Sequence, residues 1–139
     1  MKTITEKLNH AFIEFYEKLS AWEANTVKDN GLTLTLVHAV EILGIFGAMP
    51  MKTLASKVGV TTGTLTVQVD KLVAADLVRR VAHESDRRSI LVELSDQGHN
   101  LFLQHDQLHQ KLTEELTADF TEEEIAQLMN LLTRINNKF

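Results

Sequence analysis

The sequence contains no cysteine and very little proline. Its 139 residues include one proline and six glycines. Without cysteine there are no disulfide bonds, no thiolate metal ligands and no thiol-based redox sensor. So few prolines and glycines leave little room for flexible linkers or low-complexity tracts. The chain is therefore predicted to fold as one domain or as one compact subunit of an oligomer.

Long hydrophobic runs are absent as well. No apolar stretch approaches the ~18 residues of a membrane span, and residues 1–7 lack the apolar core of a signal peptide. Together with the missing cysteines, this predicts a cytoplasmic protein without a membrane partner. Hydrophobic residues make up 44% of the chain and charged residues 24%, which is enough of each for an ordinary folded core and surface.

Basic residues are scarce and unevenly distributed. The net charge is −5, which alone argues against a nucleic-acid partner. Residues 51–90, however, hold seven basic and four acidic side chains, a net charge of +3, so the rest of the chain carries −8. This asymmetry indicates a basic functional face on an acidic body. A chance fluctuation of charge is the alternative.

Apolar residues at spacings of three and four predict helices, and an alternating pattern predicts one hairpin. The expected elements are helices over 4–25, from 33 or 35 to 46, over 51–58, 62–75 and 96–117, a hairpin over 77–94, and a last helix that follows residue 121. Thr121 and Glu124 have the spacing of a capping box. The side chains expected to be buried in the second helix are Leu36, Val40, Leu43 and Phe46.

A short helix, a turn at Gly59 and a second helix match the helix-turn-helix pattern, and the hairpin that follows is interpreted as a wing. The predicted fold class is therefore mainly α with a small β-hairpin wing, a winged helix-turn-helix. The tip of the hairpin is Asp86-Arg87-Arg88-Ser89. Arginines at such a tip can reach into a nucleic-acid groove, which favours a regulator that binds double-stranded DNA.

Three residues of the tip have expected roles, and Ser89 is a further candidate DNA contact of the wing. Arg88 is expected to enter a narrow A·T-rich minor groove, whose negative potential attracts guanidinium groups. Asp86, on the same side of the extended chain, can hold that guanidinium by a charge-assisted hydrogen bond, while Arg87 meets phosphate. A solvated, charged hairpin tip is the alternative. Further phosphate contacts are expected from Lys52, Lys57, Arg79 and Arg80.

The helix over 62–75 is expected to read bases. Leu65, Val69 and Leu72 define its buried stripe. The opposite face would enter the major groove, which admits one helix, and its residues are Thr62, Gly63, Thr66, Val67, Asp70 and Lys71. Thr64 is a further candidate DNA contact on this helix. Methyl groups of Thr66 and Val67 can pack on thymine, and Gly63 lets the backbone approach closely. The alternative for Val67 is a core position in a slightly rotated helix.

The first helix and the last two helices are acidic and rich in leucine. One small winged helix cannot bury the apolar faces of all three. A twofold homodimer with interleaved terminal helices is therefore predicted, and a monomer whose terminal helices fold back on its own core is the alternative. This divides the chain into an N-terminal dimerisation helix (1–32), a DNA-binding domain (33–95) and C-terminal dimerisation helices (96–139).

The order of elements, the tip Asp86-Arg87-Arg88 and the stretch VELSDQG at 92–98 resemble the MarR family of bacterial transcriptional regulators. The resemblance covers nearly the whole chain and is strongest over 54–98. It implies homodimers, palindromic operators, repression by default and release from DNA when a small ligand binds. Val67 stands where the family often has arginine, which predicts A·T-rich operators. Residues 59–66 and 28–44 also resemble repressors of fatty-acid synthesis genes.

The resemblance also implies an effector pocket between the dimer core and the winged-helix lobe, for a small molecule that the sequence does not identify. The candidate lining residues are Phe12, Phe15, Trp22, His38, Phe46 and Met49.

Some MarR regulators sense zinc through histidines in comparable regions. Here His105 and His109 lie four residues apart, so that both can face one ligand, and His38 resembles another such ligand. Val37, however, stands where a carboxylate is expected, and cysteine is absent. We therefore expect no metal and no cofactor, with a zinc-responsive regulator that uses these three histidines as the alternative.

Two other function classes fit the sequence less well. His105, Asp106 and His109 could act as acid–base groups, but no nucleophile motif and no phosphate loop accompanies them. An enzyme would also leave the basic wing unexplained, so no enzyme is expected. The remaining alternative is an interaction module without DNA affinity.

Overall fold

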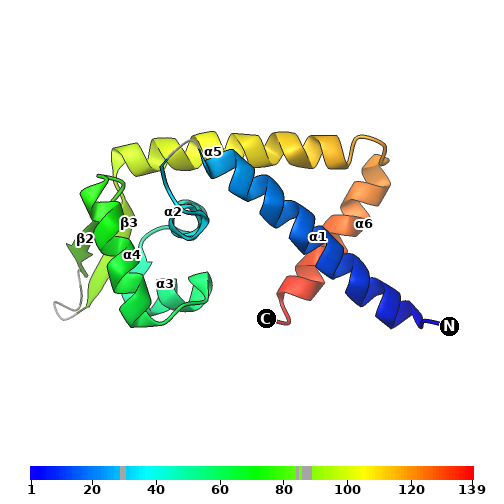
Figure 1. Ribbon diagram of the computed structural model, residues 1–139, viewed down its shortest axis with the longest axis horizontal. Coiled ribbons are helices and arrows are strands. Elements are labelled where there is room, and N and C mark those ends of the chain that lie inside the picture. The colour runs from blue at the N-terminus through cyan, green and yellow to red at the C-terminus, as the bar shows by residue number, and fades with distance from the viewer. Residues whose placement is uncertain (29–30, 84, 86–88) are drawn as a thin grey trace. The chain divides into compact units, whose positions relative to one another are not determined.

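The computed structural model describes residues 1–28, 31–83, 85 and 89–139. Its elements are α1 (Ile4–Val27), α2 (Leu34–Phe46), β1 (Met49–Pro50), α3 (Met51–Val58), α4 (Thr62–Ala74), β2 (Val78–Ala82), β3 (Ile90–Leu94), α5 (Asp96–Leu116) and α6 (Glu122–Asn136), as Figure 1 shows. The predicted helices and both strands of the hairpin are confirmed. The fold class is confirmed with them: a largely helical chain that carries a small antiparallel sheet.

The chain forms two compact units, Met1–Phe102 and Leu103–Phe139. The first unit holds α1 to α4, the three strands and the first turns of α5, and the second holds the rest of α5 and all of α6. The predicted segments 1–32, 33–95 and 96–139 were defined by function, and the two compact units do not test them. This division stays a prediction. None of the helices in the described part of the chain combines the length and hydropathy that a membrane span requires.

Threonine side chains begin four of the helices. Thr33, Thr61 and Thr121 each accept a hydrogen bond from a backbone amide in the first turn of α2, α4 and α6, respectively. The predicted capping box of Thr121 with Glu124 is confirmed. A second capping box, between Thr3 and Glu6 at the start of α1, was not predicted although its spacing is the same.

The sheet has three strands in the order β1-β3-β2, and neighbours are antiparallel. Strand β1 was not predicted, because two residues carry no periodic signal and Pro50 was interpreted only as a helix terminator. It pairs Met49 with Val92 and Pro50 with Leu91. Proline is tolerated on an edge strand, where its missing N–H can face away from the ladder. This strand anchors the wing to the segment between α2 and α3.

The core of the first unit lies between α2, α3, α4 and the sheet. Leu54, Leu65, Val69, Leu72 and Val92 have exposed fractions of 0%. Leu36, Val40 and Leu43 are buried as predicted.

The expectation for Phe46 was wrong, because 62% of this residue is exposed. Phe46 is the last residue of α2, where the helix has already passed the edge of the core. Its ring lies beneath the ammonium group of Lys57, whose Nζ is 4.2 Å from the ring centroid.

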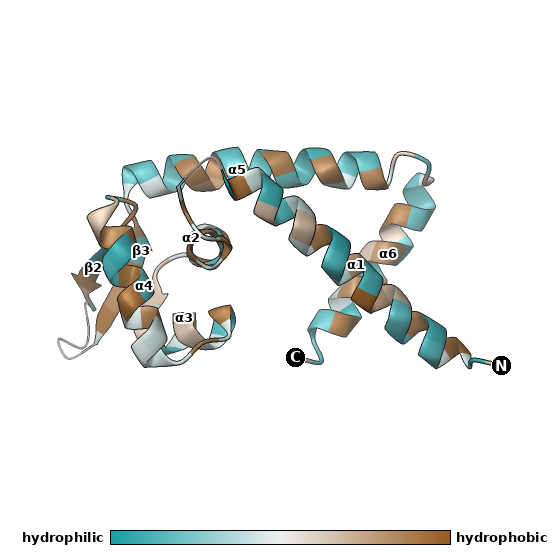
Figure 2. Cartoon of the chain, in the orientation of Figure 1, coloured by the Kyte–Doolittle hydropathy of each residue, from teal (hydrophilic) through white to brown (hydrophobic). Residues whose placement is uncertain are grey.

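The terminal helices leave apolar side chains exposed. No residue of α6 is buried, and Figure 2 shows hydrophobic residues interspersed along both α1 and α6. The exposed large apolar residues of α1 are Ile4, Leu8, Phe12, Ile13, Phe15 and Tyr16, and those of α6 are Ile125, Leu128, Met129, Leu131, Leu132 and Ile135. Large exposed apolar areas on a protein are candidate interaction sites, whereas single exposed apolar residues are ordinary.

Candidate nucleic-acid interface

Helix α4 has one buried face and one exposed face. Leu65, Val69 and Leu72 are fully buried, as the periodicity predicts. The predicted DNA contacts Thr62, Gly63, Thr64, Thr66, Val67 and Lys71 are all exposed, and so is Asp70 on the face predicted to enter the groove. The exposed fraction of Val67 is 55%, so this valine is not a core residue. The helix therefore presents a mixed methyl and hydroxyl surface with room for a partner.

The turn before α4 fixes where that surface begins. Gly59 has a φ of +83°, a left-handed conformation in which a side chain would be strained. The amides of Gly59 and Val60 both donate to the carbonyl oxygen of Ala55, at 2.9 and 3.0 Å. Ala55 itself is buried between the helices, where its small side chain permits a close crossing. These contacts connect α3 to α4 through one rigid turn.

The packing of the chain does not require glycine at position 63. A Cβ at this position would meet nothing closer than Thr61 Oγ1 at 4.0 Å. Thr66 lies on the same exposed face, and its hydroxyl donates to the carbonyl oxygen of Thr62 at 2.9 Å. Because that hydroxyl has used its proton, its lone pairs are the part that can meet a partner.

Strands β2 and β3 form the base of the wing. They pair in register from Val78 with Leu94 to Ala82 with Ile90, and the amide of His83 donates to the carbonyl oxygen of Ser89 at 3.0 Å. Ser89 is half-buried. The expectations for Asp86, Arg87 and Arg88 lie outside the described residues, so their roles remain predictions.

Two arginines of β2 are ion-paired within the first unit. Arg80 Nη2 lies 2.6 Å from Asp70 Oδ1 on α4, and Arg79 Nε lies 2.7 Å from Glu93 Oε1 on β3. The Glu93 pair follows from the cross-strand register and could have been anticipated from the hairpin. The Asp70 pair joins elements that the sequence does not place side by side. Both pairs reduce the positive charge available to a phosphate.

The other two predicted phosphate contacts, Lys52 and Lys57, are exposed.

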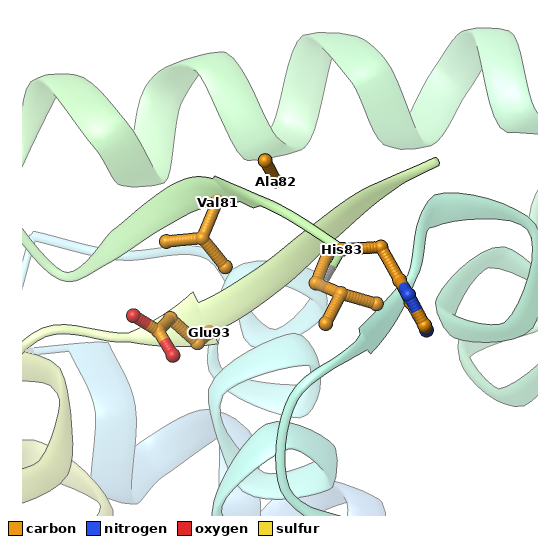
Figure 3. A pocket seen from close by; sticks show the side chains of 5 residues that line it. Val81, Ala82, His83 and Glu93 are labelled. Atoms are coloured by element: carbon orange, nitrogen blue, oxygen red, sulfur yellow. The ribbon is translucent and has the colours of Figure 1, made fainter. Parts of the chain in front are cut away.

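The wing also carries a shallow hollow of about 400 Å³, lined by Val81, Ala82, His83, Leu91 and Glu93. Figure 3 shows these side chains on and beside the two strands of the wing. His83 Nδ1 accepts a hydrogen bond from the amide of Ser85 at 3.1 Å. None of the residues predicted to line an effector pocket is among the residues that line this hollow.

Those predicted pocket residues all lie in the first unit but differ in their surroundings. Met49 is buried in the core, Trp22 and His38 are half-buried, and Phe12, Phe15 and Phe46 are exposed. His38 Nε2 lies 2.9 Å from Glu23 Oε2, and Glu23 is 8% exposed. This carboxylate was missed in the sequence, because a glutamate in an acidic amphipathic helix gives no sign that it is buried.

The other two candidate histidines face each other in the second unit. His105 Nε2 and His109 Nε2 are 3.1 Å apart, as the spacing of four residues predicts. Asp106 Oδ2 instead accepts a hydrogen bond from Gln110 at 3.1 Å. Asp106 is thus held by Gln110, one helical turn further along α5.

An exposed helix of a helix-turn-helix, followed by a two-stranded wing, defines the class of winged-helix DNA-binding proteins. Residues 32–90 match the MarR family. Over this segment the chain is similar to the MarR family, the family that its sequence resembles. The predicted class, a DNA-binding regulator, agrees with this match.

Curated relatives agree with this assignment. The HTH-type transcriptional regulator MhqR of Bacillus subtilis (strain 168) is 26% identical over 135 residues, which are 95% of this chain and 93% of that protein. The multiple antibiotic resistance protein MarR of Escherichia coli (strain K12) is 36% identical over 77 residues, which are 55% of this chain and 54% of that protein.

Solved structures share the fold over nearly the whole chain. Streptococcus pneumoniae FabT in complex with DNA has a TM-score of 0.80 and 20% sequence identity, and the match covers 96% of this chain and 95% of that one. NadR in complex with 4-hydroxyphenylacetate has a TM-score of 0.81 and 18% identity, with coverage of 97% and 96%.

Proposed function

We propose that this chain is a sequence-specific transcriptional regulator that binds a palindromic operator as a homodimer and represses until a small ligand releases it. The observation that carries the proposal is the exposed face of α4, where all six residues predicted to contact DNA are exposed while Leu65, Val69 and Leu72 are fully buried. Such a regulator acts in the cytoplasm, where the bacterial chromosome lies.

In this proposal α4 enters the major groove and the wing reaches the minor groove beside it. Thr62, Thr66 and Val67 contact bases, while Lys71, Lys52 and Lys57 contact phosphates. Arg87 and Arg88 supply the positive charge of the wing, because Arg79 and Arg80 are already paired with carboxylates. The fold shared with the DNA complex of FabT supports this arrangement of elements.

A homodimer is supported by the apolar side chains that α1 and α6 leave exposed. Their partner in the proposal is a second copy of the chain, since a twofold axis brings identical faces together. Two copies also place two α4 helices for two half-sites, about one helical turn (~34 Å) apart on one side of the duplex.

The DNA-binding proposal is tested by incubating the purified protein with sheared genomic DNA, recovering bound fragments and repeating the binding with each fragment in a mobility-shift assay. The expected result is a small set of fragments that share an inverted repeat. Retention of fragments without a common sequence would indicate non-specific binding only, and no retention would contradict the proposal.

Ligand release is proposed for a small aromatic or carboxylic molecule that binds near Phe12, Phe15, Trp22, His38, Phe46 and Met49. The 4-hydroxyphenylacetate bound to NadR, which has the same fold, supports this class of effector. Screening such compounds for a rise in melting temperature tests the idea, because a ligand that binds the folded state stabilises it by mass action. A true effector must also displace the protein from its operator.

Metal-responsive regulation is the second candidate, and the close approach of His105 and His109 favours it. Two imidazole nitrogens 3.1 Å apart on one helix supply two of the four ligands that zinc prefers. Titration with Co²⁺ should then produce visible absorption bands that are lost in His109→Gln and kept in His10→Gln, a matched change on exposed α1. The absence of such bands in the unaltered protein would eliminate this candidate.

A further inference from the structure

Close backbone contacts link the turn after α4 to the beginning of α5. The hydroxyl of Ser95 donates a hydrogen bond to the carbonyl oxygen of Asp76 at 2.6 Å, and the amide of Ser95 donates to that of Leu77 at 3.0 Å. Gly98 is buried, and a Cβ there would overlap the carbonyl oxygen of Leu77. The two backbone segments therefore contact each other without an intervening side chain.

The same turn also connects α4 to the wing. Helix α4 ends at Ala74 and β2 begins at Val78, so Asp76 and Leu77 lie between them. The φ of Asp76 is +63°, in the left-handed region that residues other than glycine rarely adopt. Such a conformation is strained and persists only where its surroundings hold it. The contacts from the start of α5 are among those surroundings.

The Ser95 hydroxyl has two distinct roles. Its oxygen accepts a hydrogen bond from the amide of Gly98 at 3.0 Å, which is the bond that an N-cap makes to its helix. Its proton goes to the carbonyl oxygen of Asp76. Because a hydroxyl has one proton and two lone pairs, one group can cap α5 and hold the turn after α4 at the same time.

We propose that Ser95 is a positioning residue for DNA recognition: the hydrogen bond it donates to Asp76 fixes the turn between α4 and β2, and so sets the orientation of the recognition helix relative to the wing. The proposal rests on the DNA-binding function proposed above. In this proposal Ser95 makes no contact with DNA. Base readout requires several side chains to meet their partners together, whereas phosphate attraction tolerates misalignment. A loosened turn therefore lowers specific binding more than non-specific binding.

Three substitutions separate the two roles of the hydroxyl. Ser95→Thr keeps both the acceptor and the donor. Ser95→Asp keeps the acceptor, since aspartate is as good an N-cap as serine, but its carboxylate has no proton to donate. Ser95→Ala removes both. A residue that only caps α5 would leave Ser95→Asp close to the unaltered protein, so this variant decides between capping and positioning.

The first readout is the ratio of affinities for a recovered genomic fragment and for a scrambled duplex, measured by fluorescence anisotropy at one salt concentration. We expect Ser95→Asp to lower this ratio about tenfold or more, with non-specific binding within about twofold and Ser95→Thr unchanged. An unchanged ratio in a folded Ser95→Asp protein overturns the proposal. If this variant does not fold, Ser95→Asp is combined with Asp76→Gly, which accommodates the positive φ without strain.

The second readout needs no DNA. Hydrogen exchange of the segment over 72–80 should become faster in Ser95→Asp, while the first turn of α5 keeps its protection. Equal protection in both proteins would overturn the positioning role even if the ratio of affinities falls. If the unaltered protein binds no fragment at all but the exchange difference is present, the DNA-binding proposal fails. The claim that the Ser95 hydrogen bond fixes the turn between α4 and β2 is then still supported. The two outcomes are therefore distinguishable.

Discussion

Arg80 on β2 donates a hydrogen bond from Nη2 to Oδ1 of Asp70 on α4, at 2.6 Å, and so joins the wing to α4. The Asp70 side chain is 61% exposed and that of Arg80 is 31% exposed. A pair this exposed contributes roughly 0.2–1 kcal/mol to stability, because water and salt screen it. Its larger effect is on charge: a carboxylate neutralises an arginine on the surface that we assign to DNA.

Replacing Asp70 by asparagine should therefore strengthen non-specific DNA binding. If the released Arg80 then meets a phosphate, the plot of log affinity against log salt steepens by about one unit per subunit, while the melting temperature changes little. Salt titrations by anisotropy measure this slope. Asp119→Asn, the same change of charge at an exposed position beyond α5, is the control. Equal effects of the two substitutions would mean that only net charge matters.

Gly63→Ala should separate folding from DNA binding. The structure has space for the new methyl group, and alanine favours a helix over glycine by up to ~1 kcal/mol, so the melting temperature should rise or stay constant. DNA affinity should fall by about tenfold, because one close contact is worth roughly 1–3 kcal/mol. Full DNA affinity in this variant would show that the start of α4 does not approach the duplex closely.

Arg88→Ala tests the wing. Loss of one phosphate-neutralising contact per subunit should reduce the steepness of the salt dependence by about one unit of the log–log slope. Specificity for A·T pairs at the flanks of the site should relax as well, because a narrow minor groove attracts guanidinium groups. Arg134→Ala, in the last turn of α6, is the control and should leave the slope unchanged. An unchanged slope in Arg88→Ala would remove this residue from the interface.

Leu132→Glu tests the homodimer. Leu132 lies on α6 and is 43% exposed in the single chain, so a charge at this position harms the fold of one subunit little. In a dimer interface, a buried unpaired carboxylate costs several kcal/mol. Sedimentation should show a species of the 15.7 kDa chain mass instead of one twice as heavy. Asn130→Glu, on another face of α6, should remain dimeric. Monomers in the unaltered protein would refute the dimer.

The sequence predicted the helices and the paired strands of the hairpin because each has a strong local cause. Apolar spacing placed Leu65, Val69 and Leu72 on one face of α4, and threonines marked where helices begin. The resemblance to the MarR family came from the stretch after the wing tip and agrees with the match over residues 32–90. Local patterns of this kind survive in any sequence that folds this way.

Features that depend on distant partners could not be predicted. Strand β1 exists because Met49 finds Val92 across the sheet, and two residues have no period of their own. The ion pair of Asp70 with Arg80 and the two roles of Ser95 require a knowledge of which turns meet in space. Phe46 looked like a core residue by spacing, but the helix ends at that point, and periodicity alone does not indicate where a core stops.

The most direct test of the central claim is the affinity of the protein for an inverted repeat recovered from genomic DNA, measured against a scrambled duplex at physiological salt, together with the stoichiometry of the complex. The account predicts two chains per duplex and a preference of about a thousandfold or more, as specific regulators show. Equal affinity for both duplexes, or one chain per site, would contradict it.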